Sequence, residues 1–331
     1  MQKTTWQKWV KDAADPKRAG HFLDLLAASD AGRQLRKCSA DQIQTLVALF
    51  SGSRALGELL VAHPDWLPEL EPGRLKFPRQ AQGFQREVEG WLKAKLAARD
   101  YSGALTELRL FKQREMLRIA ARDLARLGDV VEITREISDV ADVCLDAVCG
   151  ICRQQFAEKF GQAYHQDAEG RWQPTEFCIL GMGKLGGQEL NYSSDVDLLF
   201  LYADEGEVGR VTPCAPTHGA AVNGGRETAR PARSITNHQF FNKLAEAISN
   251  EVSRLTADGF LFRVDLRLRP EGDTGPLARS LESYENYYAQ WGQIWERMML
   301  IKARCVAGDA GLGDEFMNTV GTRRFLKDTP I

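Results

Sequence analysis

The stretch 177-FCILGMGKLGGQELNYSSDVDLLFLY-202 decides the architecture expected for this chain. It holds a short apolar run, a glycine-rich turn and a second apolar run that opens with two aspartates. Side chains two positions apart in an extended strand point to the same face, so Asp195 and Asp197 are expected to project together. The stretch therefore predicts two strands joined by a glycine-rich turn, with two carboxylates side by side.

The paired carboxylates predict a metal site. Two like charges held together repel each other, and a divalent cation is the simplest way to stabilise them. Hard oxygen ligands suit Mg²⁺, and two such ions can stabilise the attacking and leaving oxygens of a phosphoryl or nucleotidyl transfer. We therefore expect Asp195 and Asp197 to bind Mg²⁺, with two ions in the site.

A third aspartate lies on the polar face of a later predicted strand. In residues 260–270, FLFRVDLRLRP, apolar and charged side chains alternate, as in a strand with one buried face. On its own, Asp265 would be one member of a surface ion pair. Beside the earlier pair, it becomes a candidate third metal ligand.

The glycine-rich turn allows two interpretations. Residues 181–186 formally match G-x-G-x-x-G, the dinucleotide-binding pattern, but the next strand follows after only about a dozen residues, its acids stand at its beginning, and no Walker A sequence is present. The favoured interpretation is a turn at Gly186 and Gly187 followed by a short helix at 188–191. Glycines allow close approach of the backbone to a phosphate, and Lys184 adds positive charge.

Composition limits the class of protein. The chain has 331 residues, 44% of them hydrophobic and 27% charged, with a formal net charge of -2, so no overall basic field favours nucleic acid as a partner. Seven cysteines without framework spacing fit a reducing compartment, and the sequence shows neither a signal peptide nor a membrane-spanning run. We expect a cytoplasmic protein without membrane contact, and a fragment of something longer.

Residues up to about 164 have helical periodicity nearly throughout. Two long amphipathic patterns cover residues 105–128 and 130–160. The charges of the first pattern are expected to form a solvated face, with Arg114 and Arg118 as alternative phosphate or partner contacts. The second pattern contains Cys149 and Cys152, a C-x-x-C that could be a redox or metal site but is more simply explained as two small packing residues.

Periodicity is lost from about residue 204 to 236, where Gly, Pro, Ala and Arg accumulate. A long insertion of this kind is expected to be either disordered or functional, with the arginines as phosphate contacts. The residues concerned are Arg226, Arg230 and Arg233, and also His218, for which no ligand partner is evident. Helical periodicity returns in 237–256, and residues 281–308 are predicted to form an aromatic-rich helix.

Several motifs together resemble one family. GMGKLGGQELNYSSDVDLLFLY, RVDLRLRPEGDTGPL and YYAQWGQIWERMMLIKAR, taken with REMLRIAARDL, look like the glutamine synthetase adenylyltransferase/adenylyl-removing enzymes, within the superfamily that includes DNA polymerase β. The resemblance covers roughly residues 50–310. It implies an α+β fold, a small mixed-sheet nucleotidyltransferase core embedded in a predominantly helical protein. The expected divisions are a helical region at 1–164, the core at 165–280 with an insertion at about 204–236, and the start of a truncated helical region at 281–331.

The resemblance also implies an activity. The family has two nucleotidyltransferase halves in tandem, and a chain with one D-x-D unit would hold one of them. The helical leader and the GMGKLGG and RPEGDTGPL motifs are closer to the N-terminal half, which removes AMP from an adenylylated tyrosine of glutamine synthetase by phosphorolysis and releases ADP. The alternatives are transfer of AMP from ATP to that tyrosine, a nucleotidyltransferase with a small-molecule or nucleic-acid substrate, or a non-catalytic fragment that binds glutamine synthetase or its regulator.

By this resemblance the aspartates would hold Mg²⁺ as a triad, and ATP or ADP and phosphate would be substrates or products. Phosphate groups would be positioned by Gly186, Gly187, Lys184 and Ser194. Arg267 and Arg269 would offset developing negative charge. The implied partners are glutamine synthetase and the PII signalling protein.

Overall fold

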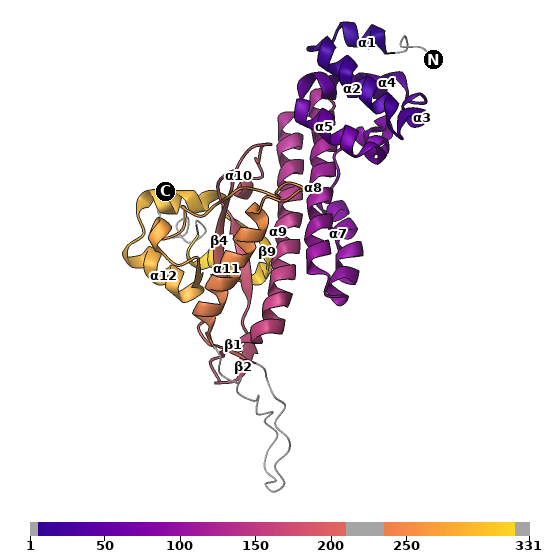
Figure 1. The fold of residues 1–331 in the computed structure, drawn as a ribbon. Coiled ribbons are helices and arrows are strands. Elements are labelled where there is room, and N and C mark those ends of the chain that lie inside the picture. The colour runs from indigo at the N-terminus through magenta and orange to yellow at the C-terminus, as the bar shows by residue number, and fades with distance from the viewer. Residues whose placement is uncertain (1–5, 210–234, 322–331) are drawn as a thin grey trace. The chain divides into compact units, whose positions relative to one another are not determined.

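The computed structural model describes residues 6–209 and 235–321 (Figure 1). The chain divides into two compact units. The helical unit comprises Met1–Glu87 with Arg109–Val140, and the sheet unit comprises Val88–Leu108 with Ala141–Ile331. Arg226, Arg230, Arg233 and His218, for which contacts were considered above, lie outside the described residues.

Short helices form the first part of the helical unit. They are α1 (Gln7–Lys11), α2 (Pro16–Ala28), α3 (Gly32–Leu35), α4 (Ala40–Gly52), α5 (Arg54–Ala62), the 3-10 helix η1 (Pro64–Leu70) and α6 (Pro72–Leu75). Asp15, Ser39 and Ser53 cap α2, α4 and α5 by accepting a backbone N–H three residues later. The apolar faces of these short helices meet in one core that includes Phe22, Leu46 and Phe50.

Three longer helices follow: α7 (Ala81–Ala97), α8 (Tyr101–Leu124) and α9 (Val130–Phe160). Both long amphipathic patterns therefore form helices, as predicted. The C-x-x-C also agrees with its simpler interpretation, because Cys149 and Cys152 are free thiols with 1% of their surface exposed. Burial raises the pKa of each of these thiols to about 12, so neither is an accessible thiolate.

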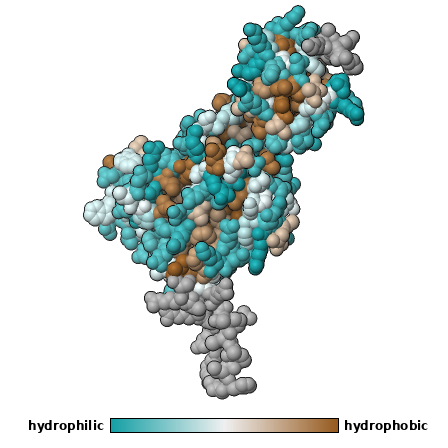
Figure 2. Space-filling view, in the orientation of Figure 1, coloured by the Kyte–Doolittle hydropathy of each residue, from teal (hydrophilic) through white to brown (hydrophobic). Residues whose placement is uncertain are grey.

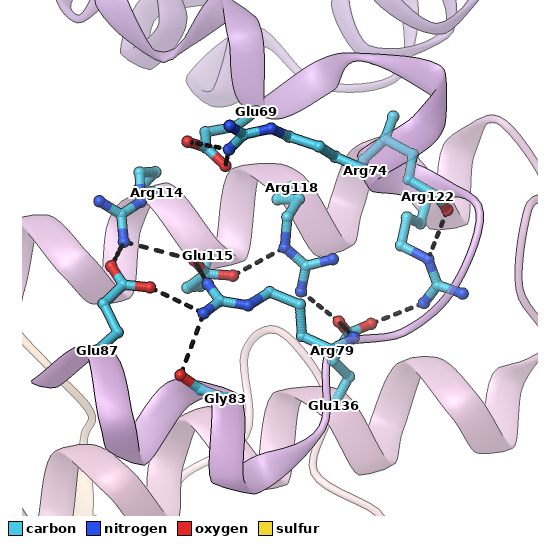
Figure 3. A network of polar contacts seen from close by, with 11 residues as sticks. Glu69, Arg74, Arg79, Gly83, Glu87, Arg114, Glu115, Arg118, Arg122 and Glu136 are labelled. Atoms are coloured by element: carbon cyan, nitrogen blue, oxygen red, sulfur yellow. Dashed lines mark hydrogen bonds and ion pairs between the residues drawn. The ribbon is translucent and has the colours of Figure 1, made fainter.

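The prediction of a solvated charged face on α8 is wrong. Arg109, Glu115, Arg118 and Arg122 are at most 2% exposed. Glu115 and Glu136 lie among the arginines (Figure 3). Glu136, from α9, accepts hydrogen bonds from Arg118 and from Arg122 Nη1, the latter at 2.7 Å. The prediction failed because helical periodicity shows only that charged residues share one face of a helix. It does not show that a second helix with charged residues, here α9, packs against that face.

Replacing Glu136 with alanine should destabilise the helical unit by about 3–5 kcal/mol, because the buried guanidiniums of Arg118 and Arg122 would each lose their ion pair with Glu136. The matched control is Glu58→Ala, whose partner Arg54 is 78% exposed and whose loss should cost under ~1 kcal/mol. Urea unfolding followed by circular dichroism measures both. Equal midpoints for the two variants would contradict the structural role given to the buried pair.

A five-stranded mixed sheet forms the centre of the sheet unit. Its strands are β3 (Phe177–Gly181), β4 (Val196–Tyr202), β7 (Val264–Asp265), β8 (Ala278–Ser280) and β9 (Arg304–Gly308). The order is β7-β4-β3-β9; β3 is antiparallel to β4 and β9, whereas β7 and β8 run parallel to β4. A second sheet has the order β2-β1-β5-β6: β1 (Gln162–Gln166), β2 (Trp172–Pro174), β5 (Glu207–Gly209) and β6 (Ile235–Thr236).

Helices cover both faces of the central sheet, which explains why its strands are continuously apolar. Phe241 of α11 (Asn237–Ser253) stacks on Phe177 and Tyr202 on one face. On the other face, Tyr284 of α12 (Leu281–Gln290) and Phe316 of α14 (Ala310–Thr319) pack with residues of β3 and β4. The predicted α+β class, a small mixed sheet within a mostly helical chain, is confirmed.

Three local predictions are corrected. Only Val264–Asp265 of the expected strand 260–270 is a strand. The one-turn helix is α10 (Gly183–Gly186), which ends at the first glycine of the Gly-Gly pair instead of following the pair. The segment 281–308, expected to be one helix, forms α12, α13 (Ile294–Met299), η3 (Leu300–Lys302) and the strand β9. Its last residues are extended because β9 pairs with β3 at the edge of the sheet.

Two further elements complete the described chain. The 3-10 helix η2 (Gly272–Thr274) follows β7, and β5 forms within a segment expected to be structureless. Within the described ranges, none of the helices combines the length and apolar character needed to cross a bilayer. The face drawn in Figure 2 is mostly hydrophilic, with hydrophobic residues gathered in patches along its middle.

Candidate active site

The pairing of β4 with β7 brings the three aspartates together. These strands are parallel, with Val196 opposite Val264 and Asp197 opposite Asp265, and paired residues project to the same face of a sheet. Asp195 directly precedes β4. The pKa of Asp197 is raised by burial of its carboxyl group and then by the negative charges of Asp265 and Asp195. Asp197 therefore lies at the centre of a group of mutually repelling carboxylates.

Two arginines hold the outer aspartates. Arg263 Nε lies 2.5 Å from Asp195 Oδ1, and its guanidinium also donates to the carbonyl of Ser193. Arg267 donates hydrogen bonds to Asp265 from its side chain and its backbone. Its Nε lies 3.0 Å from each carboxylate oxygen, and its backbone N–H donates to Oδ1 at 2.9 Å. These bonds lower the pKa of Asp265. Asp265 is therefore held as a carboxylate.

Arg263 was not among the predicted site residues. Its signal was present in the sequence, because Arg263, Asp265 and Arg267 alternate along the same short segment. A strand of only two residues places the arginines just outside β7, where their long side chains reach back to the aspartates. The arginines reduce the repulsion among the acids that a metal ion would otherwise have to relieve.

The carboxylates fit a metal ion by chemistry. Three oxygen donors on adjacent strands are the ligand type that Mg²⁺ prefers. In residues 6–209 and 235–321, however, no three Asp, Glu, His or Cys side chains are arranged to coordinate a cation, since Asp195 and Asp265 are directed at arginines. Arg263 and Arg267 are 59% and 73% exposed, so water can replace them on the carboxylates. The donor set suits Mg²⁺ once the outer aspartates turn from their arginines.

The glycine-rich turn packs against the start of β4. The Met182 N–H donates to the carbonyl of Asp197 at 2.9 Å. Gly183 has a φ of 53°, and a Cβ there would lie 2.6 Å from Asp197 Oδ2. Left-handed backbone and close approach both require glycine at this position. The turn therefore fixes the backbone on which the central carboxylate is carried.

The Gly-Gly pair has two different environments. Gly186 is buried, and a Cβ at this position would come within 2.1 Å of the Lys302 carbonyl oxygen and 2.5 Å of the Gly181 carbonyl oxygen. At Gly187 the nearest atom would be Lys302 Cδ, the flexible part of a side chain, at 3.0 Å. Glycine is therefore required at position 186, because three backbone segments pack closely there. At Gly187 a Cβ could be accommodated if the Lys302 side chain moved.

Lys184 and Ser194 lie next to each other at the exposed side of the turn. Lys184 Nζ is 3.4 Å from Ser194 Oγ, and that hydroxyl donates to Asn191 Oδ1 at 2.5 Å. An ammonium group and a hydroxyl are both suitable donors to a phosphate oxygen. Their predicted role in positioning a phosphate is thus compatible with their placement, and remains a prediction.

Arg269 has a different position from Arg267. It is 8% exposed, and its guanidinium donates to the carbonyls of Leu266 at 2.6 Å and Gly275 at 3.3 Å. These bonds hold the loop that follows β7 in a fixed shape. Arg267 therefore contacts an acid of the group directly, while Arg269 shapes the backbone beside it.

Arg304, at the start of β9, secures the turn from the other side. Its guanidinium forms a bidentate pair with Asp142 of α9, at 2.6 and 2.9 Å. It also donates to the carbonyls of Leu185 and Gly186, at 3.1 and 3.2 Å. No local sequence pattern indicates this link, because it joins residues 162 positions apart.

The glutamate-ammonia ligase adenylyltransferase family matches residues 43–215 and 221–319. The chain belongs to this family. It is 38% identical over 287 residues to the bifunctional glutamine synthetase adenylyltransferase/adenylyl-removing enzyme of Thioalkalivibrio sulfidiphilus, covering 86% of the chain and 27% of the relative. It is 36% identical to the enzyme of that name from Pseudomonas aeruginosa over 324 residues, covering 95% and 30%.

A third relative of that name, from Nitrosococcus oceani, is 41% identical over 210 residues, covering 63% of this chain and 19% of the relative. The chain thus spans less than a third of the length of these curated relatives. The family resemblance inferred from the motifs is confirmed. Family membership alone does not assign to this chain either of the two activities in the name of these relatives.

The two glycines should respond differently to substitution. Gly186→Ala should destabilise the sheet unit by roughly 1–3 kcal/mol, because its Cβ meets two backbone carbonyls that cannot move independently. Gly187→Ala should leave the melting temperature nearly unchanged, since only a lysine stem must shift. Differential scanning calorimetry of the two variants tests this contrast. A stable Gly186→Ala protein would show that the turn is held less tightly than described.

Asp197→Asn should raise the melting temperature of the metal-free protein at pH 7.5. The substitution removes a half-buried charge that Asp265 and Asp195 repel, and each kcal/mol relieved adds ~2–4 °C in a protein of this size. Mg²⁺ should stabilise the wild type and have little effect on the variant. Asp24→Asn, at an exposed position of α2, is the control. A Mg²⁺ response that survives in Asp197→Asn would exclude this carboxylate as a ligand.

Proposed function

We propose that the chain is a Mg²⁺-dependent nucleotidyltransferase that acts on glutamine synthetase and removes AMP from its adenylylated tyrosine by phosphorolysis. The observation that carries the proposal is the register of β4 with β7, which sets Asp197 level with Asp265 and next to Asp195. Family membership supports the substrate, since the curated relatives are named for adenylyl transfer to and removal from glutamine synthetase.

In this proposal Asp195, Asp197 and Asp265 hold the Mg²⁺ ions. When bound, such ions supply positive charge at the phosphoryl oxygens and at the oxygen that leaves. A phosphate oxygen forms a new bond to the phosphorus of AMP as the bond to the tyrosyl oxygen breaks. The tyrosyl oxygen takes up the proton that the phosphate loses, which yields ADP and the unmodified tyrosine side chain of glutamine synthetase. In-line positioning and charge stabilisation are the main requirements of such a transfer.

The remaining residues of the site would position the reactants. Lys184 and Ser194 lie together at the exposed edge of the turn, where their donors can reach phosphate oxygens. Gly187 gives access to the backbone beside them. Arg267, once released from Asp265, is long and exposed enough to offset charge on a phosphoryl group. Gly186 and Arg269 would act indirectly, through the shape of the turn and of the loop after β7.

The direction of the reaction rests on the motifs. The helical leader and the GMGKLGG and RPEGDTGPL segments favour the AMP-removing half, and α1 to α9 occupy nearly all of the described chain before β1. The PII signalling protein is proposed as the regulatory partner on the same resemblance. The opposite direction, AMP transfer from ATP to the tyrosine, requires the same acids and is therefore distinguished only by assay.

Incubation of the protein with adenylylated glutamine synthetase, phosphate and Mg²⁺ should release ADP. Asp195→Asn and Asp197→Asn should each lower the rate about a thousandfold or more, since a metal ion contributes several kcal/mol to such a transition state, while Asp24→Asn should retain it. ADP is measured by coupled enzymatic assay, and glutamine synthetase by mass spectrometry.

The products decide between the alternatives. Incorporation of AMP from ATP, with no ADP released from the adenylylated protein, would reverse the proposed direction. Full turnover in either aspartate variant would refute the role of the acids. Binding of glutamine synthetase with neither reaction would indicate a non-catalytic fragment.

A further inference from the structure

We propose that the helical unit binds a small oxyanion, a phosphate or carboxylate group, in a cavity lined by arginines. The cavity has a volume of about 410 Å³. It lies at the ionic cluster shown in Figure 3. Its lining residues, from η1, the segment after it, α7 and α8, are Glu69, Arg74, Arg79, Glu87, Arg114 and Arg118.

Arg118 supplies the donor on which the proposal rests. Its side chain is 2% exposed and lines the cavity. Nε donates to Glu115 at 2.8 Å, and Nη2 donates to Glu136. Nη1 has no hydrogen-bond partner among the described residues. A buried guanidinium nitrogen without a partner is unfavourable unless something occupies the space before it.

Arg114 provides a second donor of the same kind. Its Nη2 pairs with Glu87, but its buried Nε has no partner within the part of the chain that the structure describes. Arg114 lies one helical turn before Arg118 on α8, so the two side chains project from the same face of that helix. Two neighbouring arginines that line the cavity thus each carry one buried N–H group without a partner among the described residues.

The charge of the lining favours an anion. Four arginines and two glutamates, Glu69 and Glu87, line the cavity. With the deeper Glu115, Glu136 and Arg122, which pair within the same cluster, five arginines stand against four glutamates. Guanidinium groups present planar pairs of donors that match carboxylate and phosphate oxygens. All six lining side chains are charged, which disfavours an apolar ligand.

The site is independent of the candidate active site. All of its lining residues belong to the helical unit, whereas the three aspartates belong to the sheet unit. The ligand is therefore an addition to the substrates of the proposed reaction. It would stabilise the helical unit by mass action, in proportion to its occupancy.

Hydrogen–deuterium exchange on the full 331-residue chain tests the proposal, with inorganic phosphate or malonate added at constant ionic strength. Peptides covering residues 66–90 and 110–120 should gain protection with at least one of the two anions, and the anion with the lower dissociation constant in calorimetry identifies the ligand class. Asp195→Asn should leave this protection unchanged, which separates it from phosphate binding at the aspartates. No protection with either anion would overturn the proposal.

Two substitutions should change the affinity in opposite directions. Arg114→Gln should weaken binding roughly tenfold or more, the effect of losing a charged hydrogen bond. Glu69→Gln should strengthen binding, because it removes a repelling carboxylate and frees Arg74, which Glu69 holds at 2.8 and 2.9 Å. A purely structural cluster would not bind more tightly after losing an acid.

Arg54→Gln, in an exposed pair of the same unit, should bind as the wild type does. If Arg114→Gln does not fold by circular dichroism, Arg74→Gln replaces it, because Arg74 is 55% exposed. Unchanged affinity in the folded arginine variant, or weaker binding in Glu69→Gln, would refute the site.

Discussion

The parallel pairing of two residues of β7 with the first two residues of β4 is the constraint on which the site depends. Asp195 and Asp197 lie close together because they are two residues apart in the chain. Asp265 is 68 residues further along, and only the pairing of β7 with β4 brings it beside Asp197. The pairing also collects three negative charges, which raises the pKa of Asp197. The three carboxylates repel one another, so the surrounding residues must hold them in place.

Two sets of contacts oppose that repulsion. Arg263 and Arg267 neutralise the outer carboxylates from the exposed side. From the buried side, the glycine-rich turn is fixed to β4 by the Met182 hydrogen bond and to α9 by Arg304 and Asp142. The arginines are exposed and exchangeable, whereas the turn is tightly packed. The geometry therefore combines a fixed backbone with exposed side chains that can change partners.

The helical unit uses charge in another way. Its buried charged residues, which include Arg118, Arg122 and Glu136, are shielded from water. Each of them therefore needs a well-placed partner, because an unpaired buried charge is strongly destabilising. Glu136 satisfies Arg118 and Arg122 together, which fixes α9 against α8 within this unit. Arg114 and Arg118, which each keep one buried N–H group without a partner among the described residues, line one cavity. In our proposal, the cluster that holds these helices together also binds an oxyanion.

The sequence by itself determined the apolar strands β3 and β4, the long helices α8 and α9, the α+β class and the family, because strand and helix periodicities and contiguous motifs are local properties. It also indicated Asp265, through alternation within one segment. Only the tertiary structure decided that β7 is two residues long, that residues 304–308 form a strand, that Gly186 is enclosed by Lys302 and that the charges of α8 are buried. Each of these depends on a partner far along the chain, and periodicity within one segment carries no information about what packs against it.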